Sequence, residues 1–479
     1  MIRSLSSTRL IHIVSSWLFT NERLVTRILI LSGVLFASAI IAPRAAMGSR
    51  MFMMLILLFF GTFPLLLLLY KPVIGILLLI PAGLYIPFSL GTGTATRLTA
   101  PIVLVILLVG FWAVDMLVRQ KKIFFLKSRP FLPLVIFVVV AFLSFGMGQL
   151  PWFLYATQAS ISAQIGGLAV FFLSAAVFFL VAHQFNDIRW VKYLTFLFLI
   201  LGSVYILGRY IPALSVERYF QRGAHGSLFW TWMVALSASQ ALFNTRLKPH
   251  WRVLLGGIAA ATLAVGWFQV RYWASGWVPG LLVVGALLFL YNWRVGLLAT
   301  IMAVIFKLAF DPGLLNQLLA ADEYSINTRQ LAWEIVLRDI LSVNPLLGVG
   351  PANYYHYTHL FPILGWYVDF NSHNQYVDLL AQTGIIGLFC FFWFSYEMGR
   401  LTWRLRTKVP EGFELAYVNG ALAGLLGTLV AGMLGDWVLP FVYNIGLIGF
   451  RASMLAWLFL GAVIVLEKIY NKDDDLVVT

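Results

Sequence analysis

The chain alternates long hydrophobic runs with short polar stretches along most of its length. Runs such as Met51–Tyr70 and Tyr193–Gly208 carry no charged residue, as a helix that crosses about 30 Å of hydrocarbon requires. The runs are continuous and lack the period-two alternation of a membrane strand. The pattern therefore predicts membrane-spanning helices and argues against an outer-membrane barrel.

Hydropathy divides the chain into about fourteen expected spans. Helix-stopping sequences at Lys71-Pro72, Gly91-Thr92-Gly93 and Lys248-Pro249 agree with this division. Residues 1–26 form an expected cytosolic or interfacial lead-in, and residues 467–479 an expected cytoplasmic tail. The spans are expected near residues 27–43, 51–70, 72–90, 100–118, 130–148, 163–183, 190–211, 227–244, 253–270, 276–292, 295–310, 374–398, 415–435 and 446–466.

One long polar interruption, residues 311–373, separates the last three spans from the others. Within it, Asn327-Thr328 is suited to begin a helix that Asn344-Pro345 ends. Glu334 and Arg338 are placed to pair across one turn of that helix. Its apolar residues predict a face that packs on the bundle or lies at the interface, and they are Leu331, Ile335, Val336 and Ile340.

Composition supports a membrane protein independently of the pattern. Hydrophobic residues make up 61% of the 479 residues and charged residues only 11%, with a mean hydropathy of +0.89. A soluble domain carries about a quarter charged residues. We therefore expect one all-α polytopic membrane domain over residues 1–479, with about 12–14 transmembrane helices in two blocks, 27–310 and 374–466.

The formal net charge of +14 does not indicate nucleic-acid binding, because the basic residues gather in short loops between apolar runs. That distribution is typical of cytoplasmic loops beside anionic lipid. With the N-terminus inside, the cytoplasmic side holds about two-thirds of the 33 Lys and Arg residues. We expect both termini in the cytoplasm, membrane lipids as neighbours and no nucleic-acid partner.

Four polar features share the outer face in this topology, at residues 209–226, 271–275, 311–373 and 435–437. They include four arginines near span ends, which are Arg218, Arg222, Arg271 and Arg329. A guanidinium can hold a diphosphate through two hydrogen bonds and offset the charge on a departing phosphate. The alternative for each arginine is a side chain that snorkels to lipid headgroups.

His373 stands where the long loop meets the span that begins near Tyr376. An imidazole has a pKa near working pH, so its neutral form can take a proton from a hydroxyl group. The alternative is a hydrogen-bonded interface histidine without a chemical role. His373 is therefore a candidate catalytic residue.

Metal and nucleotide chemistry find little support in the sequence. His356 and His359 have the spacing of metal ligands, but no third ligand stands beside them, and the outer face lacks a DxD motif. The chain also lacks a Walker loop, a dinucleotide fingerprint and a nucleophile elbow. A single cysteine, Cys390, excludes an internal disulfide. We expect neither a metal nor a cofactor.

Three blocks of sequence, in this order, resemble the O-antigen ligase and polymerase superfamily. They are Thr328–Trp333, then Asn344–Gly350, then Ser372–Tyr376 followed by Thr383–Gly387. In that family an arginine-tryptophan helix, a Pro-x-x-Gly-x-Gly turn and a His-Asn span entry occur in and after one large periplasmic loop. Outside these blocks the chain matches only in its multi-span hydropathy and in isolated arginines.

The resemblance implies a metal-independent, inverting glycosyltransferase with a GT-C-like fold in the bacterial inner membrane. Its donor would be a glycan on an undecaprenyl-diphosphate carrier, and its site would face the periplasm. By position in the motifs, His373 matches the essential histidine of the family and Arg329 the arginine of its loop.

Two earlier arginines match the family pattern less fully. Arg222-Gly223 resembles the arginine before an earlier span, but the residues after it lack the expected Pro-Asn. Arg271 resembles the arginine of a Ser-Arg-Gly stretch, but it follows Val270 instead of serine. Arg218 therefore competes with Arg222 for the same role.

The acceptor remains open at this stage. A ligase would join the glycan to lipid A-core, and a polymerase would join it to another lipid-linked glycan; the ligase is the slightly favoured interpretation. A polytopic flippase or transporter for lipid-linked glycans is the alternative from another class, although such a protein needs charged residues along a central cavity. A membrane scaffold would leave the outer arginines unexplained.

Overall fold

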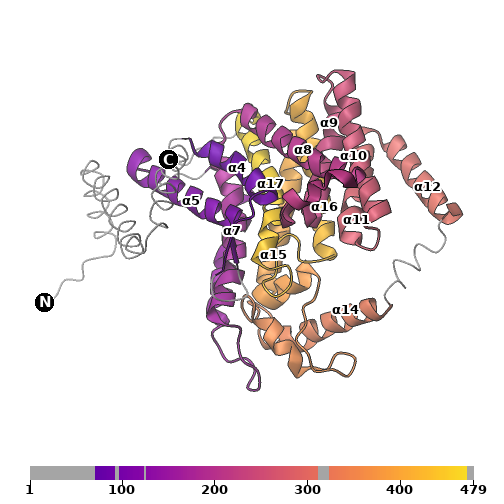
Figure 1. Ribbon diagram of the computed structural model, residues 1–479. Coiled ribbons are helices and arrows are strands. Elements are labelled where there is room, and N and C mark those ends of the chain that lie inside the picture. Colours follow the sequence, from indigo (N-terminus) through magenta and orange to yellow (C-terminus); the bar gives the residue numbers. More distant parts are fainter. Residues whose placement is uncertain (1–70, 92–96, 123–125, 311–322, 472–479) are drawn as a thin grey trace, which may run out of the picture. The chain divides into compact units, whose positions relative to one another are not determined.

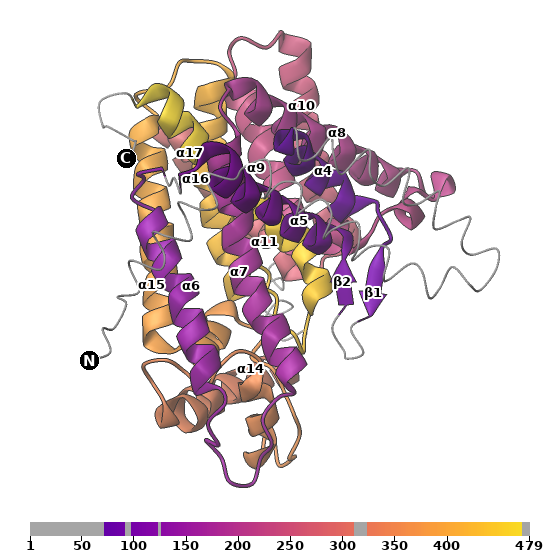
Figure 2. The same ribbon diagram turned by 90° about the vertical axis from the view of Figure 1, so that its left-hand side faces the viewer.

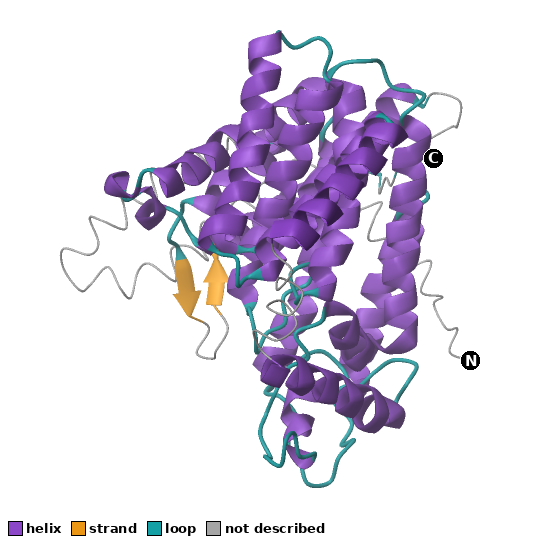
Figure 3. Cartoon of the chain, turned by 90° about the vertical axis from the view of Figure 1, so that its right-hand side faces the viewer, coloured by secondary structure: helices purple, strands orange, loops and turns teal. Residues whose placement is uncertain are grey.

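The computed structural model describes residues 71–91, 97–122, 126–310 and 323–471. Two short strands, β1 (Ser89–Gly91) and β2 (Arg97–Thr99), pair antiparallel beside the helices (Figure 3). The helices are α4 (Pro72–Leu84), α5 (Ala100–Val114), α6 (Phe131–Met147), α7 (Ile161–Gln184), α8 (Ile188–Tyr210), α9 (Ser227–Phe243), α10 (Pro249–Gln269), α11 (Ala274–Tyr291), α12 (Trp293–Phe310), α14 (Glu323–Ile335), α15 (Gln375–Leu405), α16 (Phe413–Met433) and α17 (Phe450–Tyr470).

This architecture confirms the all-α polytopic class. Within the described residues, eight helical segments are long and apolar enough to cross a membrane. The spans expected at 27–43 and 51–70 lie outside the described residues, and each of the other expected spans coincides with a helix. The helices α4 and α6 are apolar but shorter than the other candidate spans.

Contacts divide the chain into two compact units. One contains Ile76–Ile106 and Leu126–Val477, and the other contains Met1–Gly75, Leu107–Phe125 and Val478–Thr479. All the features that follow belong to the first unit. The expected division into a lead-in, two transmembrane blocks, a loop and a tail stays a prediction.

The centre of the larger unit is formed by helices that are apolar on every side. Nearly all residues of α17 are buried, and so is α9 from Ser227 to Gln240 (Figure 1). Glycines of α16 let α9 approach closely, since a Cβ at Gly424 would lie 2.8 Å from the Trp232 ring. Small residues at such contacts are how membrane helices gain packing. By contrast, α10 keeps most of its surface exposed.

Contacts between loops show which polar segments lie at the same end of the helices. They fall into two groups, as the alternating topology predicts. At one end, the Gln221 backbone N–H donates to the Leu84 carbonyl over 2.6 Å, and Trp273 packs on Trp437 with ring centroids 5.6 Å apart. At the other end, Lys192 pairs with Glu414 over 3.1 Å. The four polar features near 209–226, 271–275, 323–373 and 435–437 therefore share one end.

A buried arginine that the sequence did not single out stabilises the end of the helices where the four polar features lie. Arg451, at the start of α17, is 2% exposed. Its guanidinium donates to the carbonyls of Ala82 and Phe88, each over 2.9 Å. A cation at the last carbonyls of a helix satisfies them and complements the helix dipole. Arg451 thus fixes the end of α4.

The helix α15 is broken at Gly384, whose φ of 66° and ψ of −170° are not helical. A turn from the long loop fills the break. The Ile385 and Ile386 backbone N–H groups donate to the Pro345 and Leu346 carbonyls over 2.9 and 3.2 Å. In return, the Val349 N–H donates to the Ala381 carbonyl over 2.9 Å. The turn therefore replaces the hydrogen bonds that the break removes, as backbone within a membrane requires.

Glycine is required on both sides of this contact. Gly348 and Gly384 have φ values of 68° and 66°. A Cβ at Gly384 would lie 2.2 Å from the Leu346 carbonyl oxygen, and one at Gly348 would lie 2.5 Å from the Ala381 oxygen. The Pro-x-x-Gly-x-Gly turn and the Thr-Gly sequence of α15 are thus the two halves of one contact.

We expect Gly384→Ala to lower thermal stability markedly. The substitution places a Cβ against backbone and forces a conformation that is nearly exclusive to glycine, which costs roughly 1–3 kcal/mol in strain alone. Thermal unfolding of the purified protein in detergent measures the change. Gly285→Ala is the matched control, because a Cβ there meets nothing within 4 Å. Equal melting temperatures for the two variants would contradict the role of Gly384.

Candidate active site

The described part of the long loop packs against the other outer segments through an apolar face. Helix α14 and the π-helix Val336–Ile340 that continues it bury four apolar residues. These are Ala332, Ile335, Val336 and Ile340, and they pack in one cluster with Tyr354, Tyr357 and Phe441. Figure 2 shows this segment below the ends of α6, α7 and α15. The predicted apolar face is confirmed, and the segment covers the bundle like a lid.

The predicted start of this helix is wrong. Asn327 and Thr328 lie inside helix α14 (Glu323–Ile335) and therefore do not cap it. Asn327 is exposed, so water can satisfy its amide within a helix. The two polar residues suggested a helix start, but they lie within the helix, on a turn that faces solvent. The predicted stop is correct, because the helical segment ends at Val343, before Asn344.

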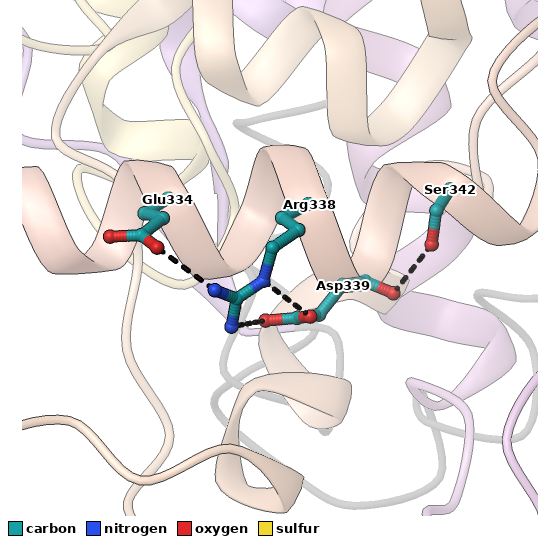
Figure 4. Close-up of polar contacts among 4 residues, drawn as sticks. All are labelled: Glu334, Arg338, Asp339 and Ser342. Atoms are coloured by element: carbon teal, nitrogen blue, oxygen red, sulfur yellow. Dashed lines mark hydrogen bonds and ion pairs between the residues drawn. The ribbon is translucent and has the colours of Figure 1, made fainter.

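On the exposed face of the lid, three charged residues pair with one another (Figure 4). Arg338 donates to Glu334 over 2.9 Å and makes two bonds of 3.0 Å to Asp339. This confirms the predicted pair across one helical turn. Because two carboxylates neutralise Arg338, it has little charge left for an anionic ligand.

His373 is held between two anchored neighbours. The Trp333 indole N–H donates to the Ser372 carbonyl over 2.7 Å, and the Ser372 hydroxyl donates to Asp378 over 2.7 Å. On the other side, Asn374 caps α15 by accepting from the Tyr376 N–H over 2.9 Å. His373 itself has a φ of 49°, a left-handed conformation that is uncommon outside glycine. Such a conformation is maintained only where its surroundings determine it.

A chain of side chains leads from His373 to a buried carboxylate. The Asn444 amide nitrogen lies 2.5 Å from Asp436 Oδ1 and 3.4 Å from His373 Nδ1. An ionised Asp436 can only accept, so it requires the amide nitrogen, not the amide oxygen, to face it. Asn444 then donates to Nδ1 as well, and a neutral His373 carries its hydrogen on Nε2.

Two buried carboxylates lie under this chain. Asp436 is completely buried, and burial raises the pKa of its carboxyl group above the ordinary range. Asp378 is 1% exposed and accepts hydrogen bonds from Tyr354 and Ser372. Burial and the neighbouring Asp378 also raise the pKa of Tyr354 well above 10. Tyr354 therefore stays protonated and serves as a donor.

Sequence reasoning missed this buried network. It marked residues 435–437 as polar but gave no role to Asp436, Asn444 or Asp378. The available signal was an acidic residue at the edge of an apolar run, which at membrane depth indicates a paired or functional group. The pairing itself joins residues that lie far apart in the chain.

The protein surroundings favour a neutral His373. Its side chain reaches solvent, yet the protein around it removes enough water to lower its pKa below 6.5, and the Arg329 cation lowers it further. His373 and Arg329, the two residues with the strongest motif matches, are therefore coupled electrostatically. Arg329 is itself exposed in α14.

The segments that carry two other candidate arginines, Arg222 and Arg271, reach the neighbouring Trp437. The loop with Arg271 reaches it through Trp273. Gly226, after the 3-10 helix Arg222–His225, lies near it, since a Cβ there would be in ordinary contact with the Trp437 ring at 3.8 Å. Arg271 stacks on Trp267, 4.9 Å from its centroid, and Arg222 is exposed. Trp437 follows Asp436 directly, so both arginine segments border the buried carboxylate.

Arg218 is placed apart from this group. It lies in the 3-10 helix Val216–Tyr219, where it donates to the Tyr219 hydroxyl over 2.7 Å. That helix packs on the outer end of α8, since a Cβ at Gly208 would lie 2.6 Å from Val216. In the described part of the chain, neither Arg218 nor Arg222 makes a hydrogen bond or ion pair with His373.

The two histidines with metal-ligand spacing have other partners. His356 Nε2 lies 3.0 Å from the Tyr443 hydroxyl, and His359 Nδ1 lies 3.0 Å from Asp369. Within the described ranges, no group of three or more His, Cys, Asp or Glu residues could hold a metal ion. His356 thus joins the long loop to the segment before α17, and His359 makes a contact within the loop.

We expect Arg329→Gln to raise the pKa of His373, because the substitution removes a nearby cation that disfavours the imidazolium. The rate at which a reagent modifies the His373 imidazole is measured as a function of pH. The pH at which this rate falls to half on the acid side gives the pKa. Arg329→Lys keeps the charge and should leave the value near that of the unmodified protein. The electrostatic link would be refuted if both variants gave the same pKa.

Comparison with known proteins tests the resemblance seen in the motifs. A search of curated proteins found no match. A family model described as O-antigen ligase matches residues 252–392. This region runs from α10 to the middle of α15 and contains Arg271, Arg329, His373 and the break at Gly384. Over this region the chain is similar to the O-antigen ligase family, and its apolar helices are those of a multi-pass membrane protein.

Proposed function

We propose that the protein is a metal-independent, inverting glycosyltransferase of the O-antigen ligase type. It moves a glycan from an undecaprenyl-diphosphate carrier to a hydroxyl of lipid A-core at the periplasmic face of the bacterial inner membrane. The observation that carries the proposal is His373, held in a left-handed conformation with a lowered pKa beside Arg329. Both residues lie in the region that matches the family.

His373 is the catalytic residue in this proposal, and it orients the acceptor hydroxyl. The acceptor oxygen forms a bond to the anomeric carbon while the bond from that carbon to the diphosphate oxygen breaks, and the hydroxyl proton passes to Nε2 of His373 in its Nδ1–H tautomer. With Asn444 donating to Nδ1, the neutral ring offers an Nε2–H to an oxygen. To take the proton at Nε2, the Asn444 amide must turn, and protonation of Asp436 would permit that turn.

The arginines act on the leaving group. Arg329 approaches from the lid, while Arg222 and Arg271 approach from the segments around Trp437. A guanidinium that is positioned before the reaction stabilises charge as it develops on the departing diphosphate. A lipid-linked donor also accounts for a site at the membrane edge, because its polyprenyl tail stays in hydrocarbon while the sugar reaches the aqueous side.

We expect His373→Ala to lower glycan transfer by about 10²–10⁴-fold, which is the usual contribution of a positioned acid or base. Transfer from a lipid-linked oligosaccharide by the purified protein measures the loss, and thermal unfolding checks the fold. His359→Ala is the control, because its exposed ion pair with Asp369 adds little stability. Near-full transfer by His373→Ala would overturn the assignment of the catalytic residue.

The acceptor is tested by reconstitution with a lipid-linked oligosaccharide, with or without lipid A-core. We expect a ligated product only when lipid A-core is present. Lengthened lipid-linked chains without it would instead show a polymerase of the same superfamily. Movement of the donor across the bilayer without either product would show a flippase.

A further inference from the structure

The peptide unit between Ser372 and His373 is held at both of its ends. Its carbonyl accepts the indole N–H of Trp333 over 2.7 Å, and its N–H donates to the side-chain oxygen of Asn371 over 3.2 Å. A peptide unit is planar, so two such bonds fix the orientation of the whole plane. They thereby also set the φ angle of His373, which relates that plane to the imidazole.

The bond from Trp333 opposes a rotation that the backbone of His373 would otherwise favour. The φ of 49° is left-handed, a conformation that a residue with a Cβ rarely adopts. A turn of the peptide plane by roughly 180° would move this φ into the extended region, which any residue adopts. The turn would also point the Ser372 carbonyl away from the indole. The hydrogen bond from Trp333 therefore stabilises the left-handed state of His373.

Water cannot take the place of the indole, because Ser372 is completely buried. The other polar groups of Ser372 are already engaged. Its N–H donates to the Tyr354 hydroxyl over 3.2 Å, and its hydroxyl donates to Asp378 over 2.7 Å. These bonds hold the rest of Ser372 and leave its carbonyl as the part that can turn. A buried carbonyl without a donor is unfavourable, so loss of the Trp333 N–H would promote the turn.

Trp333 also connects this peptide unit to the helix that carries Arg329. The two residues lie one turn apart in α14, on the same face. The Trp333 ring packs on the apolar cluster of the lid, so its place relative to the loop is defined. The bond to Ser372 therefore helps to set the position of Arg329 relative to His373, whose imidazole feels the arginine's charge.

We propose that Trp333 is a positioning residue for His373: its indole N–H, through the Ser372 carbonyl, directs the imidazole and keeps it within electrostatic range of Arg329. This inference rests on the proposed function for the chemical role of His373. It assigns to the tryptophan of the lid helix a task that packing alone does not require, since the ring of phenylalanine would also fit an apolar cluster.

Removal of the indole N–H alone tests this role. Benzothienylalanine in place of Trp333 keeps the shape of the side chain and has sulfur where tryptophan has N–H. We expect kcat for glycan transfer to fall roughly tenfold, as the loss of one hydrogen bond predicts, with little change in KM. Thermal unfolding checks that the protein is folded.

The same replacement of Trp152 is the matched control. That indole packs against the same cluster and donates to the Met147 carbonyl over 2.9 Å, but it does not contact the peptide unit before His373. Its replacement should therefore leave kcat unchanged. Equal kcat values for the proteins altered at Trp333 and at Trp152 would overturn the proposal.

A second measurement follows His373 directly and needs no glycan transfer. Trp333→Phe should raise the pKa of His373 towards 6.5, because the imidazole leaves the protein surroundings and the Arg329 cation that lower it. The rate of modification of the His373-containing peptide against pH gives this value, and Trp152→Phe should leave it unchanged. An unaltered pKa in Trp333→Phe would refute the positioning role.

The two ends of the peptide unit supply a test that separates positioning from general stability. Asn371→Ala removes the acceptor of the His373 N–H and should also lower kcat. Because both side chains act on one rigid plane, the double variant with Trp333→Phe should lose little more than the weaker of the two single variants. Losses that multiply would show two independent effects and contradict action through a common plane.

The positioning role and the proposed function fail in different ways. A raised pKa of His373 in Trp333→Phe, in a protein that transfers no glycan, would sustain the positioning role and refute the transferase. Glycan transfer at the normal rate without the Trp333 N–H would sustain the transferase and refute the positioning role.

Discussion

Backbone hydrogen bonds at membrane depth have to be satisfied within the protein, and the broken helix α15 shows how this chain meets that requirement. At Gly384 the helix loses its regular bonds, and the turn at residues 345–349 replaces them with its own N–H and carbonyl groups. The turn is thereby attached to a transmembrane helix. Since the same loop continues to His373, this contact helps to set where the candidate catalytic residue lies.

A second constraint comes from the buried carboxylates. Asp436 and Asp378 are removed from water, so each requires hydrogen-bond donors around it. Asp436 accepts a hydrogen bond from the Asn444 amide, which also lies within hydrogen-bond distance of His373. Asp378 accepts a hydrogen bond from Ser372, the residue before His373. The two carboxylates thus hold the histidine indirectly, one through Asn444 and the other through Ser372. This accounts for an exposed imidazole in a conformation that a free loop would not keep.

Much of the fold followed from local pattern. Apolar runs predicted the apolar helices from α4 to α17 with each end within seven residues, because hydrocarbon demands long uncharged segments whatever the neighbours are. Residue spacing also predicted the pairing of Glu334 with Arg338 and the end of the lid helix at Asn344. The start of that helix was wrong, since Asn327 suits both a cap and an exposed turn, and local chemistry does not separate the two.

The sequence by itself determined the membrane class, the sorting of polar loops to one end, and the candidates His373, Arg329 and Arg271. Each of these depends on residues that are close together in the chain. Only the tertiary structure decided that Asn444 joins His373 to Asp436, that the Gly348 turn fills the break at Gly384, and that Trp333 holds the carbonyl before His373. These contacts link distant residues through burial, and burial exists only once the helices have packed.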